Sequence, residues 1–277
     1  MSDARTPRLR CPPGATDTHM HFYGPYARFP LAPTSPNAPP EALLPDYRAL
    51  QARLGLERVV VVQPAGYLCD NRCTLEAVAA LGPRARAVVV VPLGTGEAEL
   101  ERLTRAGAVG LRVFLLPGGI FQWQQLPELA AMARTVGWHL QLQFNGRLLP
   151  ERMTLLESLD CELVFDHVGR FMDPVPVEHE AFRCLLRLVD KGAYVKLSAP
   201  YESSRTGPPD WPDVSPLARA LVRAAPERML WASNWPHPGR APQDEAALLD
   251  LLLDWAPDEA DRRRILVENP ARLYRFG

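Results

Sequence analysis

The amino-acid sequence predicts an α/β fold, a single closed (β/α)8 TIM barrel, and three observations support this prediction. Short apolar runs, rich in valine and leucine, alternate with amphipathic stretches along most of the 277 residues. The apolar runs are nearly continuous, as in parallel strands that are buried on both faces of a sheet. Eight such strand–helix units in roughly 250 residues are the usual composition of a closed barrel.

The same pattern also decides between one domain and two, and between a closed barrel and an open sheet. The length allows either two small domains or one barrel, but the sequence shows neither an internal repeat nor a linker. We therefore expect a polar tail at 1–13 and one domain at 14–277. An open doubly wound sheet is the second choice, because no apolar run is followed by a glycine-rich dinucleotide-binding turn.

The first predicted strand lies at 16–21, where side chains alternate between two faces. This alternation points His19 and His21 in the same direction, roughly 7 Å apart along the strand. Two imidazoles presented together can bind one metal ion, or can bind an anionic or carbonyl-bearing ligand.

A long proline-rich loop follows this strand, over residues 22–45. Structureless loops of this length are uncommon inside a compact domain unless they serve a function. Because the loop leaves directly from the histidine strand, we expect it to form a lid or a pocket wall. Its candidates for touching a ligand are Tyr23 and Tyr26.

The remaining elements follow in regular order, and glycines end several of the helices. The other predicted strands are 58–63, 87–91, 109–115, 138–144, 161–166, 193–198 and 229–233. The predicted helices are 46–54, 74–81, 97–106, 126–136, 148–159, 182–190, 217–224 and 244–255, with an appended C-terminal helix at 258–268.

Composition excludes several classes of partner. The net charge of −1 and the isoelectric point near 6.6 provide no basic excess for nucleic acid. No apolar run approaches the length of a membrane span, and no apolar segment follows Met1. Five cysteines, an odd number without paired spacing, indicate a reduced protein. We expect a cytoplasmic protein without a nucleic-acid or membrane partner.

Polar and charged residues fall in, or just past, the later part of the predicted strands. In a parallel barrel these strand ends share one rim, where active sites lie. A buried strand has no structural need for arginine, lysine or histidine, since an unpaired buried charge is costly. The sequence therefore predicts a catalytic or ligand-binding site from Gln63, Arg112, Gln143, Asn145, His167, Arg170, Lys196, Asn234 and His237.

Four segments carry a family resemblance. They resemble the amidohydrolase superfamily and, more narrowly, its branch of 2-pyrone-4,6-dicarboxylate lactonases and galactarolactone isomerases. The resemblance runs in order from about Pro12 to Tyr274, and it implies a (β/α)8 fold and acid–base chemistry on a carboxylated lactone. The segments are TDTHMH at 16–21, FDHVGR at 165–170, WASNWPH at 231–237 and NPARLY at 269–274.

Two positions depart from the metal-dependent members of this superfamily. Those members use the His-X-His pair, histidines on the fifth and sixth strands and an aspartate after the eighth. Here the fifth strand offers Gln143, a poor metal ligand, and the eighth offers Asn234. His19, His21 and His167 alone lack the negative charge that a hydrolytic metal finds in its ligands. We therefore expect no metal and no other cofactor.

Asn234 also shifts the expected reaction from hydrolysis towards isomerisation. A neutral amide cannot take a proton from attacking water, although it can bind a hydroxyl or a carbonyl. In a lactone isomerase the nucleophile is a hydroxyl of the substrate itself. The resemblance thus favours a metal-independent isomerase of a sugar-acid lactone, with a small anionic lactone as its substrate.

The expected roles follow from side-chain chemistry. Arg112, Arg170 and Arg205 would hold the carboxylate. His19, His21 and Asn234 would polarise the lactone carbonyl and its developing oxyanion. His167 or Lys196 would move the proton, and His167 is favoured because its ordinary pKa lies near working pH. Further binding candidates are Gln63, Gln143, Asn145, His237 and Tyr23.

Two alternatives stay open at this point. One is a lactone hydrolase of the 2-pyrone-4,6-dicarboxylate lactonase type, in which Asn234 stands as an engineered replacement for a natural aspartate. The other, from a different class, is a non-catalytic barrel that binds a small dianion. Turnover of a lactone separates this last alternative from both enzymes.

Overall fold

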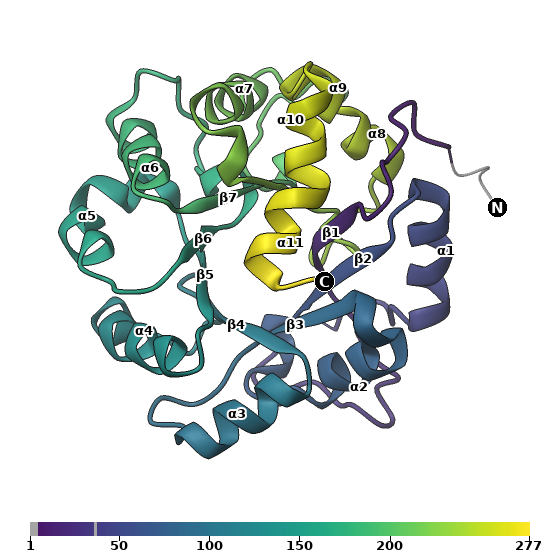
Figure 1. Ribbon diagram of the computed structural model, residues 1–277, viewed down its shortest axis with the longest axis vertical. Helices are drawn as coiled ribbons and strands as arrows, with labels where there is room; N and C mark the ends of the chain where they lie inside the picture. Colours follow the sequence, from purple (N-terminus) through teal and green to yellow (C-terminus); the bar gives the residue numbers. More distant parts are fainter. Residues whose placement is uncertain (1–4, 36–37) are drawn as a thin grey trace.

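The computed structural model describes residues 5–35 and 38–277, and it confirms the predicted barrel. Eight parallel strands form one sheet in the order in which they occur in the chain, with helices between them on the outside (Figure 1). The strands are β1 Thr16–Met20, β2 Arg58–Val62, β3 Ala85–Val89, β4 Ala108–Phe114, β5 His139–Gln143, β6 Leu163–Phe165, β7 Tyr194–Leu197 and β8 Met229–Trp231.

The helices alternate with these strands, and most begin or end at residues whose backbone preferences suit a terminus. Proline stands in the first turn of several helices, where its missing N–H costs nothing. Gly55 ends α1 with a left-handed φ of 74°. The helices are α1 Leu44–Leu54, α2 Arg72–Leu81, α3 Glu97–Arg105, α4 Leu126–Thr135, α5 Leu149–Glu157, α6 Glu180–Asp190, α7 Ser215–Ala224, α8 Glu245–Asp250, α9 Leu252–Trp255, α10 Glu259–Arg263 and α11 Asn269–Tyr274.

The seam between β8 and β1 is closed by hydrogen bonds that extend beyond the strand ends. The Thr18 hydroxyl donates to the Trp231 carbonyl at 2.9 Å. The Asn234 N–H donates to the His19 carbonyl at 2.8 Å, and the His21 N–H to the Trp235 carbonyl at 2.8 Å. The chain segment after β8 is therefore attached to the histidine strand.

The histidine strand departs from the simple alternation that its sequence predicts. Its register against β2 shifts between Asp17 and Met20, and all five of its residues are buried. The rings of His19 and His21 nevertheless lie together, with centroids 4.8 Å apart. The two imidazoles are therefore closer together than the roughly 7 Å of regular strand spacing.

One end of the barrel is closed by the C-terminal helices. The appended helix extends further than predicted: α10 continues through a π-helical turn at Arg264–Glu268 into α11. These helices lie across the barrel in Figure 1, and Tyr274 is buried in a cluster with Tyr194 and Val109 at the starts of their strands. The opposite end, where the strands finish, is left for a site.

The loop after β1 folds back on itself. Tyr23 pairs with Ala42 through an isolated β-bridge, and the Tyr26 hydroxyl donates to the Pro39 carbonyl at 2.7 Å. Residues 36–37 of this loop, like residues 1–4 of the predicted tail, lie outside the described residues. From Arg5 onward the tail is tied to α8, because the N–H groups of Arg8 and Leu9 both donate to the Asp250 carboxylate.

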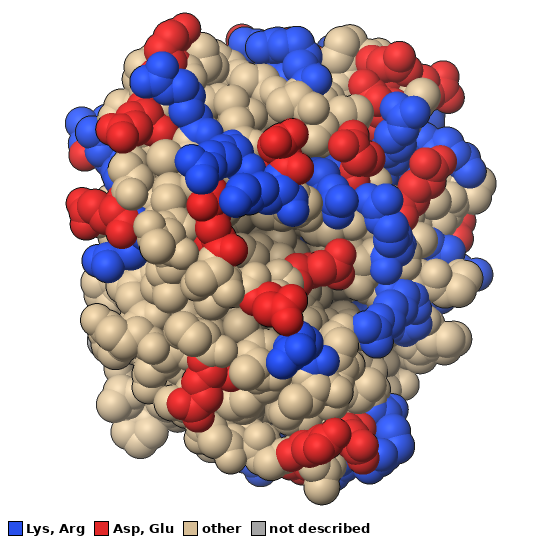
Figure 2. All heavy atoms as spheres, turned by 60° about the vertical axis from the view of Figure 1, so that its left-hand side comes forward, with Lys and Arg blue, Asp and Glu red and all other residues tan. Residues whose placement is uncertain are grey.

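The surface carries mixed charge. Figure 2 shows one face on which Lys and Arg side chains are interspersed with Asp and Glu side chains, and neither sign covers the face alone. In the described part of the chain, no helix has the length and the apolar character needed to cross a membrane.

Candidate active site

A cavity of about 320 Å³ opens at the end of the barrel where the strands finish. Seven of the residues predicted from the sequence line it, and they come from five of the eight strands or the segments that follow them. These residues are His21, Tyr23, Arg112, Gln143, His167, Arg170 and Asn234.

The hydrogen of the His21 ring has a defined position beside His19. His21 Nδ1 lies 2.7 Å from the Val62 carbonyl, so this nitrogen carries a hydrogen. Burial, followed by the charge of Arg112, lowers the pKa of His21 to about 3, so the ring is neutral. Its Nε2 is then an acceptor and lies 3.2 Å from His19 Nε2, while His19 Nδ1 lies 3.2 Å from an Asp166 oxygen.

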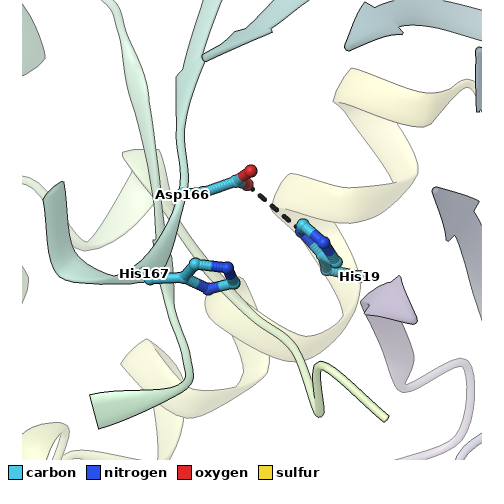
Figure 3. A group of neighbouring side chains, drawn as sticks. All are labelled: His19, Asp166 and His167. Carbon is cyan, nitrogen blue, oxygen red and sulfur yellow. Dashed lines mark hydrogen bonds and ion pairs between the residues drawn. The ribbon is translucent and has the colours of Figure 1, made fainter. Parts of the chain in front are cut away.

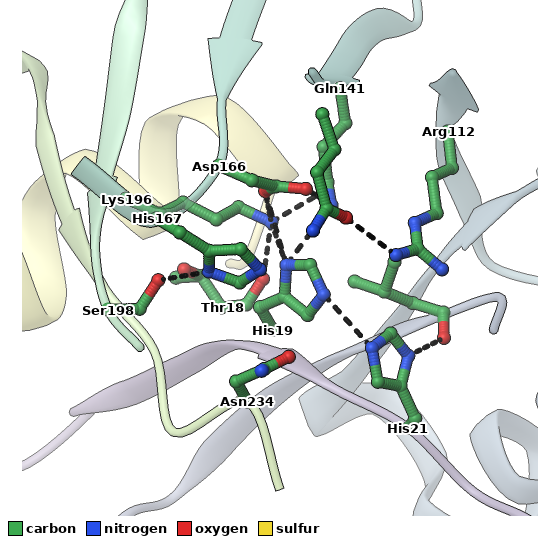
Figure 4. A network of polar contacts seen from close by, with 12 residues as sticks. Thr18, His19, His21, Arg112, Gln141, Asp166, His167, Lys196, Ser198 and Asn234 are labelled. Atoms are coloured by element: carbon green, nitrogen blue, oxygen red, sulfur yellow. Dashed lines mark hydrogen bonds and ion pairs between the residues drawn. The ribbon is translucent and has the colours of Figure 1, made fainter. Parts of the chain in front are cut away.

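Beneath His19 lies a fully buried group of polar side chains, shown in Figure 4. The Lys196 ammonium donates to the Thr18 carbonyl at 2.9 Å and to Gln141 Oε1 at 2.6 Å. It also lies 3.3 Å from His19 Nδ1 and 3.5 Å from an Asp166 oxygen. Burial lowers the pKa of Lys196 to about 8, against the opposing effect of Asp166, so the ammonium persists at neutral pH.

His167 faces the cavity from the segment that follows β6. Its Nδ1 lies 2.9 Å from the Ser198 hydroxyl, and its ring centroid is 5.1 Å from that of His19 (Figure 3). Burial lowers the pKa of His167 well below its ordinary value, and the charge of Asp166 opposes this effect. The ring is therefore a neutral imidazole, which is the form that accepts a proton.

Arg112 is a buried cation that has no acidic partner within the part of the chain that the structure describes. Its guanidinium donates to the Gln63 carbonyl at 2.6 Å and to Gln143 Oε1 at 2.8 Å, and both of these partners are neutral. The side chain is only 5% exposed, and its Nε has no hydrogen-bond partner among the described residues. A buried charge in this condition favours an anion in the adjoining cavity.

The mouth of the cavity adds two further arginines, which share one carboxylate. Arg170 and Arg240 lie 2.7 and 3.3 Å from the same oxygen of Glu202. With Arg112, the lining thus holds three arginines and one glutamate, a positive excess of two charges. The cavity is suited to an anionic ligand.

Asn234 lies beside the histidines at the end of the segment that closes the barrel (Figure 4). Its backbone has a left-handed φ of 56°, and its side-chain amide donates to the Tyr201 hydroxyl at 2.9 Å. Asparagine adopts this backbone conformation more readily than most residues. The side chain is therefore fixed at the cavity wall by a partner that does not itself line the cavity.

The structure places four predicted binding residues outside the cavity lining. Gln63 uses its side chain to hold the turn at Leu68 and Asp70, although its carbonyl supports Arg112. Asn145 accepts from two backbone N–H groups of neighbouring loops. Arg205 is exposed and paired with Asp173. His237 contacts Tyr201 instead, at 2.7 Å.

Two of the predicted catalytic residues, His19 and Lys196, lie beneath the cavity rather than on its surface. The fifth strand also needs a correction. Gln141, and not Gln143, is the residue beside His19, because Gln141 Nε2 lies 3.2 Å from His19 Nδ1 while Gln143 is bound to Arg112 at the rim.

Several residues around the site escaped prediction. Asp166 and Gln141 could have been found, since each precedes a predicted residue by one or two positions on its strand. Tyr201 and Glu202 stand in a single 3-10 turn after β7 and Arg240 in the loop after β8, and neither segment carries a periodic signal in the sequence. Ser198 follows Lys196 by two residues and binds His167.

A parallel barrel with buried histidines, a buried lysine and an excess of arginine charge at its strand ends defines a TIM-barrel enzyme. The amidohydrolase family model matches residues 16–276, so the chain belongs to the amidohydrolase family. The predicted branch of this family is confirmed by the relatives that the chain resembles.

Two curated relatives span nearly the whole chain. D-galactarolactone isomerase from Agrobacterium fabrum is 39% identical over 280 residues, with 98% of this chain and 94% of the relative covered. The 2-pyrone-4,6-dicarboxylate hydrolase from Comamonas testosteroni is 34% identical over 281 residues, with 97% and 92% covered. Among solved structures, an apo crystal structure of an Agrobacterium tumefaciens protein matches with a TM-score of 0.91 at 39% identity, covering 98% of this chain and 99% of that chain.

Proposed function

We propose that this protein is a metal-independent lactone isomerase that acts on a small anionic lactone of a sugar acid. The observation that carries the proposal is the composition of the cavity. It combines an anion-binding excess of arginine with a neutral imidazole at His167 and a neutral amide at Asn234. The likeness to a relative named D-galactarolactone isomerase supports the same reaction.

Arg112 and Arg170 bind the carboxylate of the substrate in this proposal. Guanidinium groups match carboxylate oxygens with two parallel hydrogen bonds. Arg112 holds its position through two neutral partners and therefore has its charge free for the ligand. Arg170 already forms an ion pair with Glu202, so it contributes less to binding of the substrate carboxylate.

The reaction moves one acyl–oxygen bond within the substrate. A substrate hydroxyl attacks the lactone carbonyl, a new C–O bond forms, and the original ring C–O bond breaks. His167 takes the proton of the attacking hydroxyl and returns it to the departing ring oxygen, so no proton is gained or lost. The positive charge of Arg112 stabilises the oxyanion that forms between these two steps.

The described part of the cavity lining offers no free carboxylate that could activate a water molecule. Asn234 carries no charge and cannot deprotonate water. Glu202 is the one carboxylate in the described part of the lining, and two arginines already occupy it. The substrate hydroxyl, in contrast, is held next to the carbonyl by binding itself.

The residues present do not fit a divalent metal. His19, Asp166 and His167 bring three ligand atoms within 4.8 Å of one another, but the Lys196 ammonium lies 3.3–3.5 Å from two of those residues. A +2 ion about 4 Å from this ammonium would be repelled by roughly 8 kcal/mol at an effective dielectric constant near 20. Lys196 itself supplies the positive charge at this position.

Activity is therefore expected to survive exhaustive chelation. Purified protein is dialysed against a strong chelator, its metal content is checked by mass spectrometry, and its turnover is compared with the untreated sample. Unchanged turnover in metal-depleted protein supports the proposal. Complete loss that zinc or manganese restores would contradict it.

A lactone hydrolase is the second candidate, because a relative named 2-pyrone-4,6-dicarboxylate hydrolase is 34% identical to this chain. A panel of aldaric acid lactones and aromatic-derived dicarboxylate lactones separates the candidates when products are followed by NMR. We expect migration of the lactone ring on a sugar-acid substrate. Accumulation of the open diacid alone would favour the hydrolase, and binding without turnover would favour the dianion-binding barrel.

The substitution Asn234→Asp is expected to slow isomerisation by about tenfold or more, which corresponds to ~1.4 kcal/mol in the barrier. The new carboxylate cannot donate to the Tyr201 hydroxyl as the amide does, and it can accept a proton from water. A hydrolytic leak should therefore appear as free diacid. If Asn234→Asp instead converts an inactive protein into a vigorous hydrolase, the hydrolase alternative is correct.

We place the protein in the cytoplasm. All five cysteines are free thiols, which supports a reducing compartment.

A further inference from the structure

A chain of buried polar contacts leads from Asn234 away from the cavity. Asn234 Nδ2 lies 2.9 Å from the Tyr201 hydroxyl, which lies 2.7 Å from His237 Nδ1. His237 Nε2 lies 3.5 Å from a carboxylate oxygen of Glu245, whose other oxygen accepts from Arg53 at 2.9 Å. The first three side chains belong to residues that are at most 8% exposed.

The contacts at the Asn234 end assign directions along this chain. The Asn234 amide donates to the Tyr201 hydroxyl, which leaves the hydroxyl hydrogen for His237 Nδ1. Nδ1 is then an acceptor, and the ring hydrogen is left on Nε2, 3.5 Å from a Glu245 oxygen that can only accept. The same hydroxyl keeps a lone pair for the amide hydrogen of Asn234.

An asparagine amide has a donor end and an acceptor end of nearly the same shape, and its surroundings decide which end faces a ligand. Here the donor end is used by Tyr201, which does not line the cavity, while Asn234 does. The amide oxygen is directed toward the side of His19 and His21 (Figure 4). Asn234 thus presents an acceptor to the cavity.

We propose that Tyr201, His237 and Glu245 are positioning residues that hold the Asn234 carbonyl oxygen toward the substrate, where it accepts a hydrogen bond from a substrate hydroxyl. The proposal rests on the proposed function and narrows its substrate class. A polyhydroxylated sugar-acid lactone carries such a donor, whereas a planar pyrone dicarboxylate does not. One hydroxyl is held by Asn234, and a different one remains for His167.

The test measures binding, so it does not depend on the reaction. Two six-carbon diacids serve as probes: galactarate, which carries four hydroxyls, and adipate, which has the same carbon skeleton without them. Their dissociation constants are measured by calorimetry for the unchanged protein and for each variant. The preference for galactarate over adipate reports the hydroxyl contacts alone, because both probes carry the same carboxylates.

Tyr201→Phe removes the acceptor that orients Asn234, so the preference should fall about three- to tenfold, the effect of one neutral hydrogen bond. His237→Leu should have the same effect, because the Tyr201 hydroxyl is then free to donate to the Asn234 oxygen. His237→Asn should retain most of the preference, since its side-chain oxygen can take the place of Nδ1.

Tyr194→Phe is the matched control. Tyr194 is also buried, and its hydroxyl accepts from Arg272 at 2.9 Å, but it lies at the closed end of the barrel. This variant should keep the full preference. An unchanged preference in Tyr201→Phe, or an equal fall in Tyr194→Phe, would overturn the proposal.

A second measurement covers variants that fail to fold. Nitrogen-15 NMR of histidine-labelled unchanged protein reports the tautomer of each ring, and loss of one signal in His237→Asn assigns His237. The proposal requires hydrogen on Nε2 and none on Nδ1. Hydrogen on Nδ1 would reverse the direction of the hydrogen bonds between His237, Tyr201 and Asn234, and it would overturn the proposal. If the protein keeps its preference for galactarate but catalyses no isomerisation, only the proposed reaction is overturned.

Discussion

Replacing His167 with asparagine is expected to lower kcat by about 100- to 10,000-fold, the usual contribution of a positioned acid–base group. His167 is the neutral imidazole that faces the cavity beside the ligand-binding arginines. Its position is set by Ser198 and by a left-handed backbone with φ of 54°. Asparagine tolerates that backbone but cannot carry the proton between the two oxygens.

The control for this variant is His179→Asn. His179 caps α6 by accepting from the Ala181 N–H, a role that asparagine also performs well. The kcat of the His179→Asn variant should therefore stay within about twofold of that of the unchanged enzyme. KM of His167→Asn should change little, because the carboxylate contacts remain. A kcat reduced less than about tenfold would show that another group moves the proton.

The pH dependence follows from the same residue. Burial lowers the pKa of His167, so the ring stays neutral as the pH falls through 6.5, the ordinary value for histidine. Activity should therefore persist to lower pH than an exposed histidine would allow, and be lost only when the ring is protonated. A profile of kcat against pH with its acidic midpoint at or above 6.5 would contradict this assignment.

Arg112→Met is expected to lower kcat/KM by about 30- to 1,000-fold, which corresponds to roughly 2–4 kcal/mol for loss of one partner in a desolvated charge pair. Methionine fills much of the same volume without the charge. The loss should appear in both KM and kcat, because Arg112 binds the carboxylate and also stabilises the oxyanion in the proposed reaction.

Arg205→Met provides the comparison. The sequence predicts a carboxylate-binding role for Arg205, but its guanidinium is exposed and paired with Asp173. Its loss should change kcat/KM by less than about threefold, as for other surface ion pairs. Equal effects of the two substitutions would mean that the cavity described around Arg112 is not where the carboxylate binds.

Most of the barrel could be predicted because buried parallel strands leave a direct signal. The valine-rich run of β2 is apolar on both faces, and the glycine that ends α1 adopts the left-handed conformation of a helix stop. The ends of strands are less certain. β6 and β8 are each three residues long, shorter than the predicted strands at 161–166 and 229–233, because backbone pairing with their neighbours covers only Leu163–Phe165 and Met229–Trp231.

The sequence predicts those site residues that lie at strand ends, and it does not identify those that stand in loops. His19, His167 and Arg112 lie together because parallel strands end at one rim. Tyr201 and Arg205 are only four residues apart in one loop, yet the first is buried behind Asn234 and the second faces solvent. No periodicity in the sequence distinguishes them, because loop backbone follows no fixed repeat.

Isotope labelling by solvent tests the central claim most directly. The enzyme is run on a sugar-acid lactone in water enriched in oxygen-18, and the product is examined by mass spectrometry against a sample without enzyme. Attack by a hydroxyl of the substrate predicts an isomerised lactone that carries no oxygen-18 beyond the control. Incorporation of one oxygen-18 atom at each turnover would show that water is the nucleophile and that the enzyme is a hydrolase.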